Sequence, residues 1–178
     1  MGWFYCSADS REIDRYVIYN YAEQTWVYGS LSRTAWLDSG IENFPRAVSS
    51  GYVYEQERGF DDDGSPMTNV FIESSDFDIG DGEQFSFIRR LIPDFKFLSN
   101  SGGGKVNIVV KTRNFPGDSL TTRATSSIGS TTQQSNIRAR GRQAVLRVES
   151  DDDDTSGNLS VGWRLGATRL DVKTDGKR

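Results

Sequence analysis

The chain has 178 residues, of which 35% are hydrophobic and 26% charged, and its formal net charge at pH 7 is -4. It has no histidine and a single cysteine, Cys6. This composition excludes an internal disulfide and a cysteine-based zinc site, and it removes the commonest general base. A mildly acidic chain also has no general attraction to nucleic acid or to anionic membranes.

Aromatic residues make up 12% of the chain, with 10 Phe, 7 Tyr and 4 Trp. Aromatic and β-branched residues favour strands, and no segment shows the 3.6-residue period of an amphipathic helix. We therefore expect an all-β fold. The apolar runs are too short to cross a bilayer and no signal peptide is evident, so synthesis in a cytoplasm is expected.

Residues 1–65 show short strands separated by tight turns. An aromatic strand, a polar turn and a returning strand that opens near a tryptophan are typical of a β-propeller blade. The segment is too short for a whole propeller, whose blades take about 40 residues each. We expect one blade and part of another, with strands at residues 3–6 (buried), 15–21, 25–28, 47–48 and 52–57, and with residues 31–38 between the two units.

The first expected strand follows Met1 directly, without a polar lead-in. Because an edge strand needs a partner, either another chain supplies it or these residues are the C-terminal part of a longer protein. We favour the second. The turn-rich stretch at residues 61–66 predicts a domain boundary, with blade strands in residues 1–65 and a second domain in residues 66–178.

Residues 66–178 predict a β-sandwich-like platform domain. The stretch 83–97 alternates over an unusual length, although Arg89 interrupts the pattern and Pro93 indicates a bend or an edge. The apolar face of this stretch is expected to carry Phe85, Phe87, Leu91, Phe95 and Phe97. Further inward-facing positions are Val106, Ile108, Val110, Val161, Trp163, Leu165, Leu170 and Val172.

Two later stretches are less regular. Residues 119–135 are rich in Ser and Thr and predict either thin edge strands or an extended arm. Residues 137–149 predict one strand in which the inward positions change parity at Gly141, where a β-bulge would fit.

The candidate interface residues are Arg138, Arg140 and Arg142, on one strand face, and Arg33 and Trp36 in the first segment. An arginine stripe could face phosphate, but the interleaved aromatics of single-strand binders are missing. Salt bridges to acids of this chain or of a neighbouring subunit are the favoured interpretation. The tryptophans could also form a sugar-stacking platform, although packing is favoured.

No catalytic, cofactor-binding or metal-binding residue is predicted. Residues 76–82 suggest a calcium loop, but an EF-hand requires Gly at its sixth position and Glu at its twelfth, and counting from Asp76 these are Asp81 and Phe87. A strand ending in an Asp-Gly turn is therefore favoured, although a looser calcium loop stays open. The acidic runs 61–63 and 151–154 are expected to be solvated loops. A glycosidase needs two carboxyls at a set separation; the candidate acids are Glu55, Glu57, Glu73, Asp76 and Asp78.

Several stretches carry a family resemblance by their order. They are YVIYNY (16–21) with Trp26, RTAWLD (33–38), IESSDFDIGDG (72–82), FIRRLIPDF (87–95), RNFPG (113–117), RARGRQ (138–143), GWRLG (162–166) and DGKR (175–178). Together they resemble the C-terminal portion of tail proteins of short-tailed (podovirus) double-stranded DNA bacteriophages. That group includes the packaged-DNA stabilisation proteins and the tail nozzle, or tail tubular B, proteins.

The resemblance implies a structural virion protein that is made in the host cytoplasm and is located in the tail. Six copies would form a homo-oligomeric ring below the portal and adaptor, next to a tail fibre or needle, with no membrane in the assembled state. Double-stranded DNA would pass through an acidic lumen during ejection. Members of the family are much longer and carry a complete propeller, so this chain would supply only its end.

Two alternatives stay open. A receptor- or glycan-binding tail appendage would present exposed Trp and Tyr side chains in a concave patch. An enzyme, the third hypothesis, would need paired carboxylates with shifted pKa values in a cleft.

Overall fold

The computed structural model describes residues 1–62, 64–67, 70–78, 84–98, 104–151 and 162–176. Within these residues the chain forms strands and no helix, which confirms the all-β class. The chain divides into two compact units, Met1–Gly59 and Phe60–Arg178, which are described separately below.

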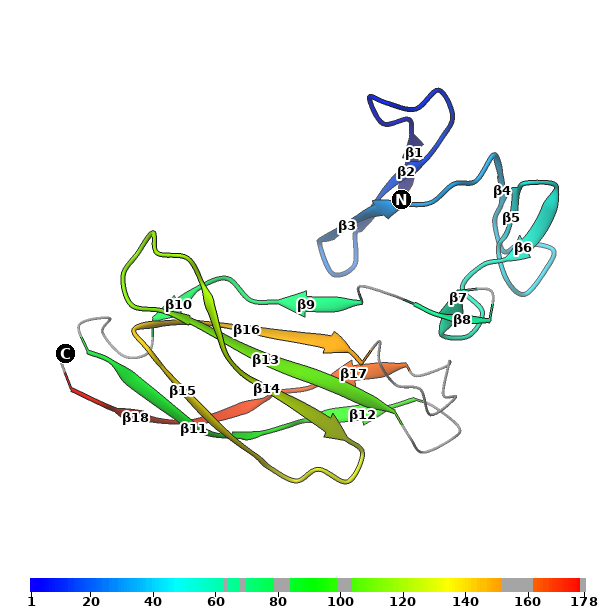
Figure 1. Cartoon of the computed structure of the whole chain (residues 1–178). Coiled ribbons are helices and arrows are strands. Elements are labelled where there is room, and N and C mark those ends of the chain that lie inside the picture. The colour runs from blue at the N-terminus through cyan, green and yellow to red at the C-terminus, as the bar shows by residue number, and fades with distance from the viewer. Residues whose placement is uncertain (63, 68–69, 79–83, 99–103, 152–161, 177–178) are drawn as a thin grey trace. The chain divides into compact units, whose positions relative to one another are not determined.

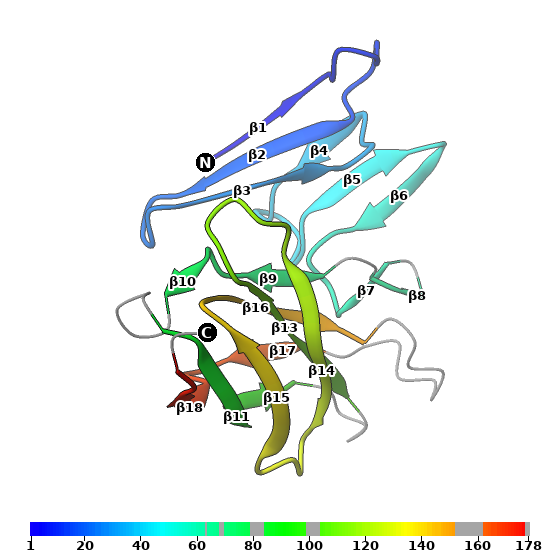
Figure 2. The same ribbon diagram turned by 60° about the vertical axis from the view of Figure 1, so that its left-hand side comes forward.

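The first unit consists of two antiparallel meanders of three strands each (Figure 2). They are β1 (Gly2–Tyr5), β2 (Arg15–Asn20) and β3 (Thr25–Ser30), then β4 (Ala35–Leu37), β5 (Arg46–Ser49) and β6 (Tyr52–Glu55). Neither sheet closes on itself.

Local chemistry explains two of the hairpins of this unit, β2-β3 and β5-β6. Ser50 and Gly51 connect β5 to β6 with φ angles of 50° and 83°, the pattern of the type I′ turn that suits the twist of a two-residue hairpin. Between β2 and β3, the side chain of Asn20 accepts hydrogen bonds from the Ala22 and Glu23 amides. Tyr16 lies over Gly29, its cross-strand partner, in space that any larger residue would fill.

Very little of this unit is buried. Of its 59 residues, only Pro45 and Ala47 are buried. The prediction that residues 3–6 form a buried strand is therefore wrong: β1 forms, but Trp3, Phe4 and Tyr5 are exposed. The physical reason is that a strand is buried only when a second layer covers it, and the short β4-β5-β6 sheet reaches one face of β1 alone, where Phe4 meets Trp36.

The second unit is a two-layered arrangement (Figure 1). One layer has the strand order β10-β16-β13-β14, with β9 also pairing with β16, and the other has the order β15-β11-β18. Two small pairs, β12-β17 and β7-β8, accompany them. The strands are β7 (Asp61–Asp62), β8 (Ser65–Pro66), β9 (Phe71–Glu73), β10 (Phe77–Asp78), β11 (Ser86–Ile92), β12 (Phe95–Phe97), β13 (Lys105–Arg113), β14 (Thr121–Gly129), β15 (Ser135–Gly141), β16 (Gln143–Ser150), β17 (Trp163–Leu165) and β18 (Arg169–Thr174).

The core of the unit lies between these layers. It contains the three inward residues predicted on β13, and Leu170 and Val172 pack against it as expected. Removing these side chains from water is a favourable contribution to the folding of the unit. The buried residues of the cluster are Ile88, Leu91, Val106, Ile108, Val110, Ile128, Ile137, Ala139, Ala144 and Val148.

The alternating stretch 83–97 is not one strand with one apolar face. It divides into β11 and β12 around Pro93, and the two belong to different sheets. A bulge at Arg89 shifts the register between Ile88 and Arg90, so Leu91 enters the core while Phe87 lies on the opposite face, in register with Arg140. One extra residue in a strand reverses the parity of all that follow.

The stretch 137–149 is likewise two strands rather than one bulged strand. At Gly141 the chain leaves the β15-β11-β18 sheet, and at Gln143 it enters the other layer as β16. The change of parity therefore marks a corner between sheets. A Cβ atom on Gly141 would lie 2.6 Å from the Cβ of Thr112 on β13, so only glycine fits where the layers meet.

The Ser/Thr-rich stretch 119–135 contributes one edge strand, β14, whose Ile128 reaches the core. Trp163 is half-buried and packs on the core, whereas Leu165 is exposed, contrary to the predicted inward face. The expected turn at residues 80–82, most of the acidic run 151–154, and Val161 lie outside the described residues.

We predict that Gly141→Ala destabilises the chain by about 1–3 kcal/mol, because the new methyl group overpacks against Thr112 and the Arg113 carbonyl. The free energy of unfolding from urea titration measures this. Gly129→Ala is the matched control, since its Cβ would meet only one backbone oxygen at 4.0 Å. Equal unfolding midpoints for the two variants would contradict the corner assignment.

Candidate functional site

One face of the β1-β2-β3 sheet is aromatic. Strand register places Trp3 opposite Val17 and Val17 opposite Tyr28, while Tyr19 lies opposite Trp26. The Trp3 and Trp26 rings stack at 6.2 Å between centroids, and the Tyr19 ring lies 4.6 Å from that of Trp26. We call this surface the aromatic face; its aromatic residues are Trp3, Tyr5, Tyr19, Trp26 and Tyr28.

The aromatic face is open to solvent in this chain. Trp26 is 61% exposed and Tyr28 is 81% exposed, and Trp3 and Tyr5 are each nearly half exposed. Aromatic rings carry a large apolar area, and a contiguous exposed apolar patch marks an interaction surface. Pairing with one another removes only part of that area from water.

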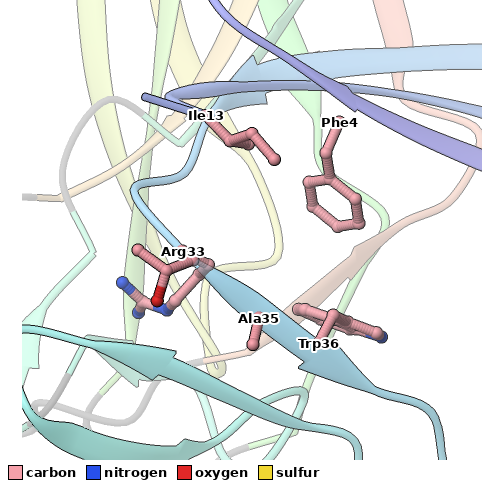
Figure 3. Close-up of a pocket in the computed structure, with 6 residues that line it drawn as sticks. Phe4, Ile13, Arg33, Ala35 and Trp36 are labelled. Carbon is pink, nitrogen blue, oxygen red and sulfur yellow. The ribbon is translucent and has the colours of Figure 1, made fainter. Parts of the chain in front are cut away.

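The opposite face of this sheet forms a small hollow with the β4 segment. Figure 3 shows the Phe4 ring pointing toward Trp36, with Ile13 above Arg33. The Phe4 and Trp36 ring centroids are 5.5 Å apart. The lining residues are Phe4, Ile13, Arg33, Thr34, Ala35 and Trp36.

Two of the predicted interface residues therefore lie together. The Arg33 guanidinium stacks 4.7 Å from the centre of the Tyr54 ring and donates to the Ser32 carbonyl, so its cation is partly engaged inside the unit. Trp36 is 38% exposed. The hollow is shallow and mostly apolar, and it holds no carboxylate.

The other three predicted interface residues lie in the second unit. Arg138 and Arg140 point outward from β15, between the buried Ile137 and Ala139. Arg140 pairs with Asp175, and the guanidiniums of Arg140 and Arg142 lie 4.2 and 5.0 Å from the centre of the Phe85 ring. The structure thus brings Arg140 and Arg142 together on one buried aromatic ring.

A network of ion pairs covers the outer face of the β16-β13 layer. Glu73 accepts hydrogen bonds from Lys111 at 2.6 Å and from Arg147 at 3.5 Å. Arg147 also pairs with Glu149 and stacks 3.6 Å from the Phe71 ring centre. Val109 and Val145 are buried on this same face, because the long aliphatic stems of lysine and arginine shield apolar neighbours while the charges stay in water.

These contacts set the local pKa values. The hydrogen bond from Lys111, aided by Arg147, lowers the pKa of Glu73. The hydrogen bond to Glu149 raises the pKa of Arg147, and the hydrogen bond from Arg89 lowers the pKa of Asp171. Each charged form is favoured by its partner, so the ion pairs persist at neutral pH.

Four of the five acids considered for a glycosidase pair are engaged with donors; the fifth, Glu57, is exposed. Asp76 pairs with Arg113, Asp78 accepts a hydrogen bond from Gln143, and Glu55 pairs with Arg58. A general acid in such an enzyme needs a raised pKa, whereas the shift at Glu73 is downward.

Among the described residues, no group of three or more cysteine or carboxylate side chains is placed to hold a metal ion. The suspected calcium stretch, residues 76–82, is described only as far as residue 78. Nor does the described part of the chain contain a helix long and apolar enough to cross a membrane. No protein-family model and no curated protein matches this chain.

Sequence reasoning missed two features of these surfaces. The aromatic face was visible as the period-two pairs Trp3/Tyr5 and Trp26/Tyr28, but packing was the favoured interpretation. The second is a set of cations on β11 and β18 that joins Arg138 and Arg140, which only the strand order β15-β11-β18 reveals.

We predict that part of the chain's stability is lost as pH falls below 4.5, the ordinary pKa of a glutamate. Because the pKa of Glu73 is lower in the folded chain, its ion pairs stabilise the fold above that value and lose this effect as pH drops through the folded pKa. The difference in unfolding free energy between wild type and Glu73→Gln should therefore be largest at neutral pH and shrink in acid. Glu12→Gln, an exposed glutamate outside the network, should show no such dependence; a pH-independent difference for Glu73→Gln would contradict the argument.

Proposed function

We propose that the chain is a structural subunit of a short-tailed phage tail, a nozzle or hub protein that assembles into a ring and has no catalytic role. The observation that carries the proposal is the first unit, in which two of 59 residues are buried while the aromatic face is open. A unit of this size with so small a core depends on neighbours for stability.

The two meanders of the first unit support a propeller origin. Each is a consecutive antiparallel sheet of the kind that forms a blade, and each is one strand short of the usual four. In the proposal they are blade parts that a further segment or a neighbouring chain completes, and the second unit is the platform. The ordered motifs that resemble podovirus tail proteins support this assignment.

The proposed assembly is a homo-oligomeric ring, a hexamer by the resemblance, in contact with an adaptor and with a tail fibre or needle. A ring built from chains of net charge -4 presents an acidic channel. Because DNA is also negatively charged, such a lumen does not retain it, and the genome slides through during ejection.

We predict that the purified chain associates at micromolar concentration. Tyr28→Lys should weaken this association by at least about tenfold, because burying an unpaired charge at the interface costs more than the about 1.4 kcal/mol that a tenfold change in affinity represents. Sedimentation velocity over a concentration series measures the change. Tyr21→Lys is the matched control: Tyr21 is 79% exposed, like Tyr28, but lies in the turn between β2 and β3. A monodisperse wild-type monomer, or equal effects of the two substitutions, would count against assembly through the aromatic face.

A second candidate function is a glycan-binding tail appendage. The observation that favours it is that the stacked Trp3 and Trp26 are exposed rather than buried, and sugar rings pack on such surfaces. Tyr5 and Tyr28 would add hydroxyl groups at the border of the face.

The glycan candidate predicts that bacterial surface polysaccharide changes the tryptophan fluorescence of the wild-type chain in a saturable manner, because binding alters the environment of Trp3 and Trp26. Trp26→Ala should abolish the change, whereas Trp163→Phe, in the core of the other unit, should retain it. A fluorescence signal that never saturates, in a chain that associates as proposed above, would leave only the structural role.

A further inference from the structure

The outer face of the β15-β11-β18 sheet concentrates positive charge. Strand register aligns Arg140, Phe87 and Lys173 in one row across the three strands, and Asn136, Arg90 and Asp171 in the next. Arg138 lies between these rows on β15, and Arg169 lies opposite Ile92. We call this surface the basic face; its cations are Arg89, Arg90, Arg138, Arg140, Arg169 and Lys173.

The charge of this face is opposite to that of the whole chain. Among the residues that the structure describes, six basic side chains of this face stand against two carboxylates, Asp171 and Asp175, an excess of four positive charges. The chain as a whole carries -4. Such segregation creates a local positive potential that the net charge conceals.

Internal ion pairs do not exhaust these cations. Asp171 is shared by Arg89 and Arg90, whose side chains remain 52% and 36% exposed. Arg138 is exposed and makes no hydrogen bond or ion pair with the described part of the chain. A guanidinium has five donors, so an arginine that spends one or two of them on a carboxylate can still bind an anion.

The cations of the basic face lie close enough together for several of them to contact one polyanion. Alternate residues of a strand stand about 6.6 Å apart and neighbouring strands about 4.8 Å apart, so cations of the three strands lie within a few such spacings of one another. Duplex DNA offers a dense array of phosphates on its surface, and arginine binds phosphate in a bidentate manner.

The composition of the face favours a nucleic acid over an acidic protein. Protein interfaces are built around buried apolar or aromatic anchors. On the basic face, Phe87 is half-buried and Ile92 is 37% exposed, while Phe85 lies beneath Arg140 and Arg142. The same lack of open aromatic rings disfavours single strands, which bind by base stacking.

We propose that the basic face binds the phosphate backbone of double-stranded DNA, without sequence preference. A three-stranded face is too broad for a groove that admits a helix or a two-stranded ribbon, so its contacts are to phosphates. The inference goes beyond the proposed ring and does not depend on it, because it rests on the charge distribution of the single chain.

The test measures fluorescence anisotropy of a labelled 30-base-pair duplex mixed with the full chain between 50 and 200 mM NaCl. If about four cations contact phosphates, log affinity should fall against log salt with a slope of about -3.6. Arg138→Gln should reduce the magnitude of this slope by about 0.9, equally for two unrelated duplex sequences. Arg138 makes no described contact, so this variant should keep the wild-type circular dichroism spectrum.

Lys105→Gln is the matched control, since it removes one exposed positive charge from β13, in the other layer. It should leave the slope unchanged, and the double variant Arg138→Glu with Lys173→Glu should abolish binding.

No duplex binding at 50 mM salt, equal effects of Arg138→Gln and Lys105→Gln, or tighter binding of a single strand would each overturn the proposal. Binding of poly-glutamate in place of the duplex would instead identify an acidic protein as the partner. A failure here leaves the sedimentation result untouched, so the two proposals stand or fall separately.

Discussion

Each sheet of this protein has two faces, and a face is buried only where a second sheet packs against it. In the second unit, the inner faces of two sheets cover each other, with β13 at the centre of one layer and β11 at the centre of the other. The first unit has no comparable pairing, so its aromatic residues stay in water. A face that another sheet covers belongs to the core, whereas an uncovered face is available for contact with other molecules.

The outer faces of the second unit show two different solutions to exposure. On the β16-β13 layer, cations and carboxylates alternate and neutralise one another around Glu73 and Arg147, which shields the buried Val109 and Val145. On the β15-β11-β18 layer, the cations exceed the carboxylates among the described residues, and these cations face outward. The balanced charges of the β16-β13 layer stabilise the fold. The excess positive charge of the β15-β11-β18 layer creates a potential that attracts a polyanion.

The first unit gives the opposite kind of surface. Its stacked Trp3 and Trp26 are apolar and uncharged, which suits a partner that excludes water, such as another subunit. The two units thus divide the work by chemistry: one surface suited to hydrophobic association and one suited to phosphate. The proposed assembly and the proposed DNA contact therefore rest on different surfaces and on different interactions.

The sequence by itself determined the class of the fold and the positions of most strands, because period-two patterns and turn residues such as Ser50-Gly51 act locally. It also placed the core residues of β13, where Val106, Ile108 and Val110 alternate without interruption. Only the tertiary structure decided which strands share a sheet. The bulge at Arg89 and the corner at Gly141 both switch the apolar positions from odd to even residue numbers or the reverse. The sequence shows the same switch whether the strand continues in its sheet or crosses to the other layer. The basic face could not be predicted from the sequence for the same reason. Its strands β11, β15 and β18 are distant in sequence, and their cations become neighbours only when the strands pair.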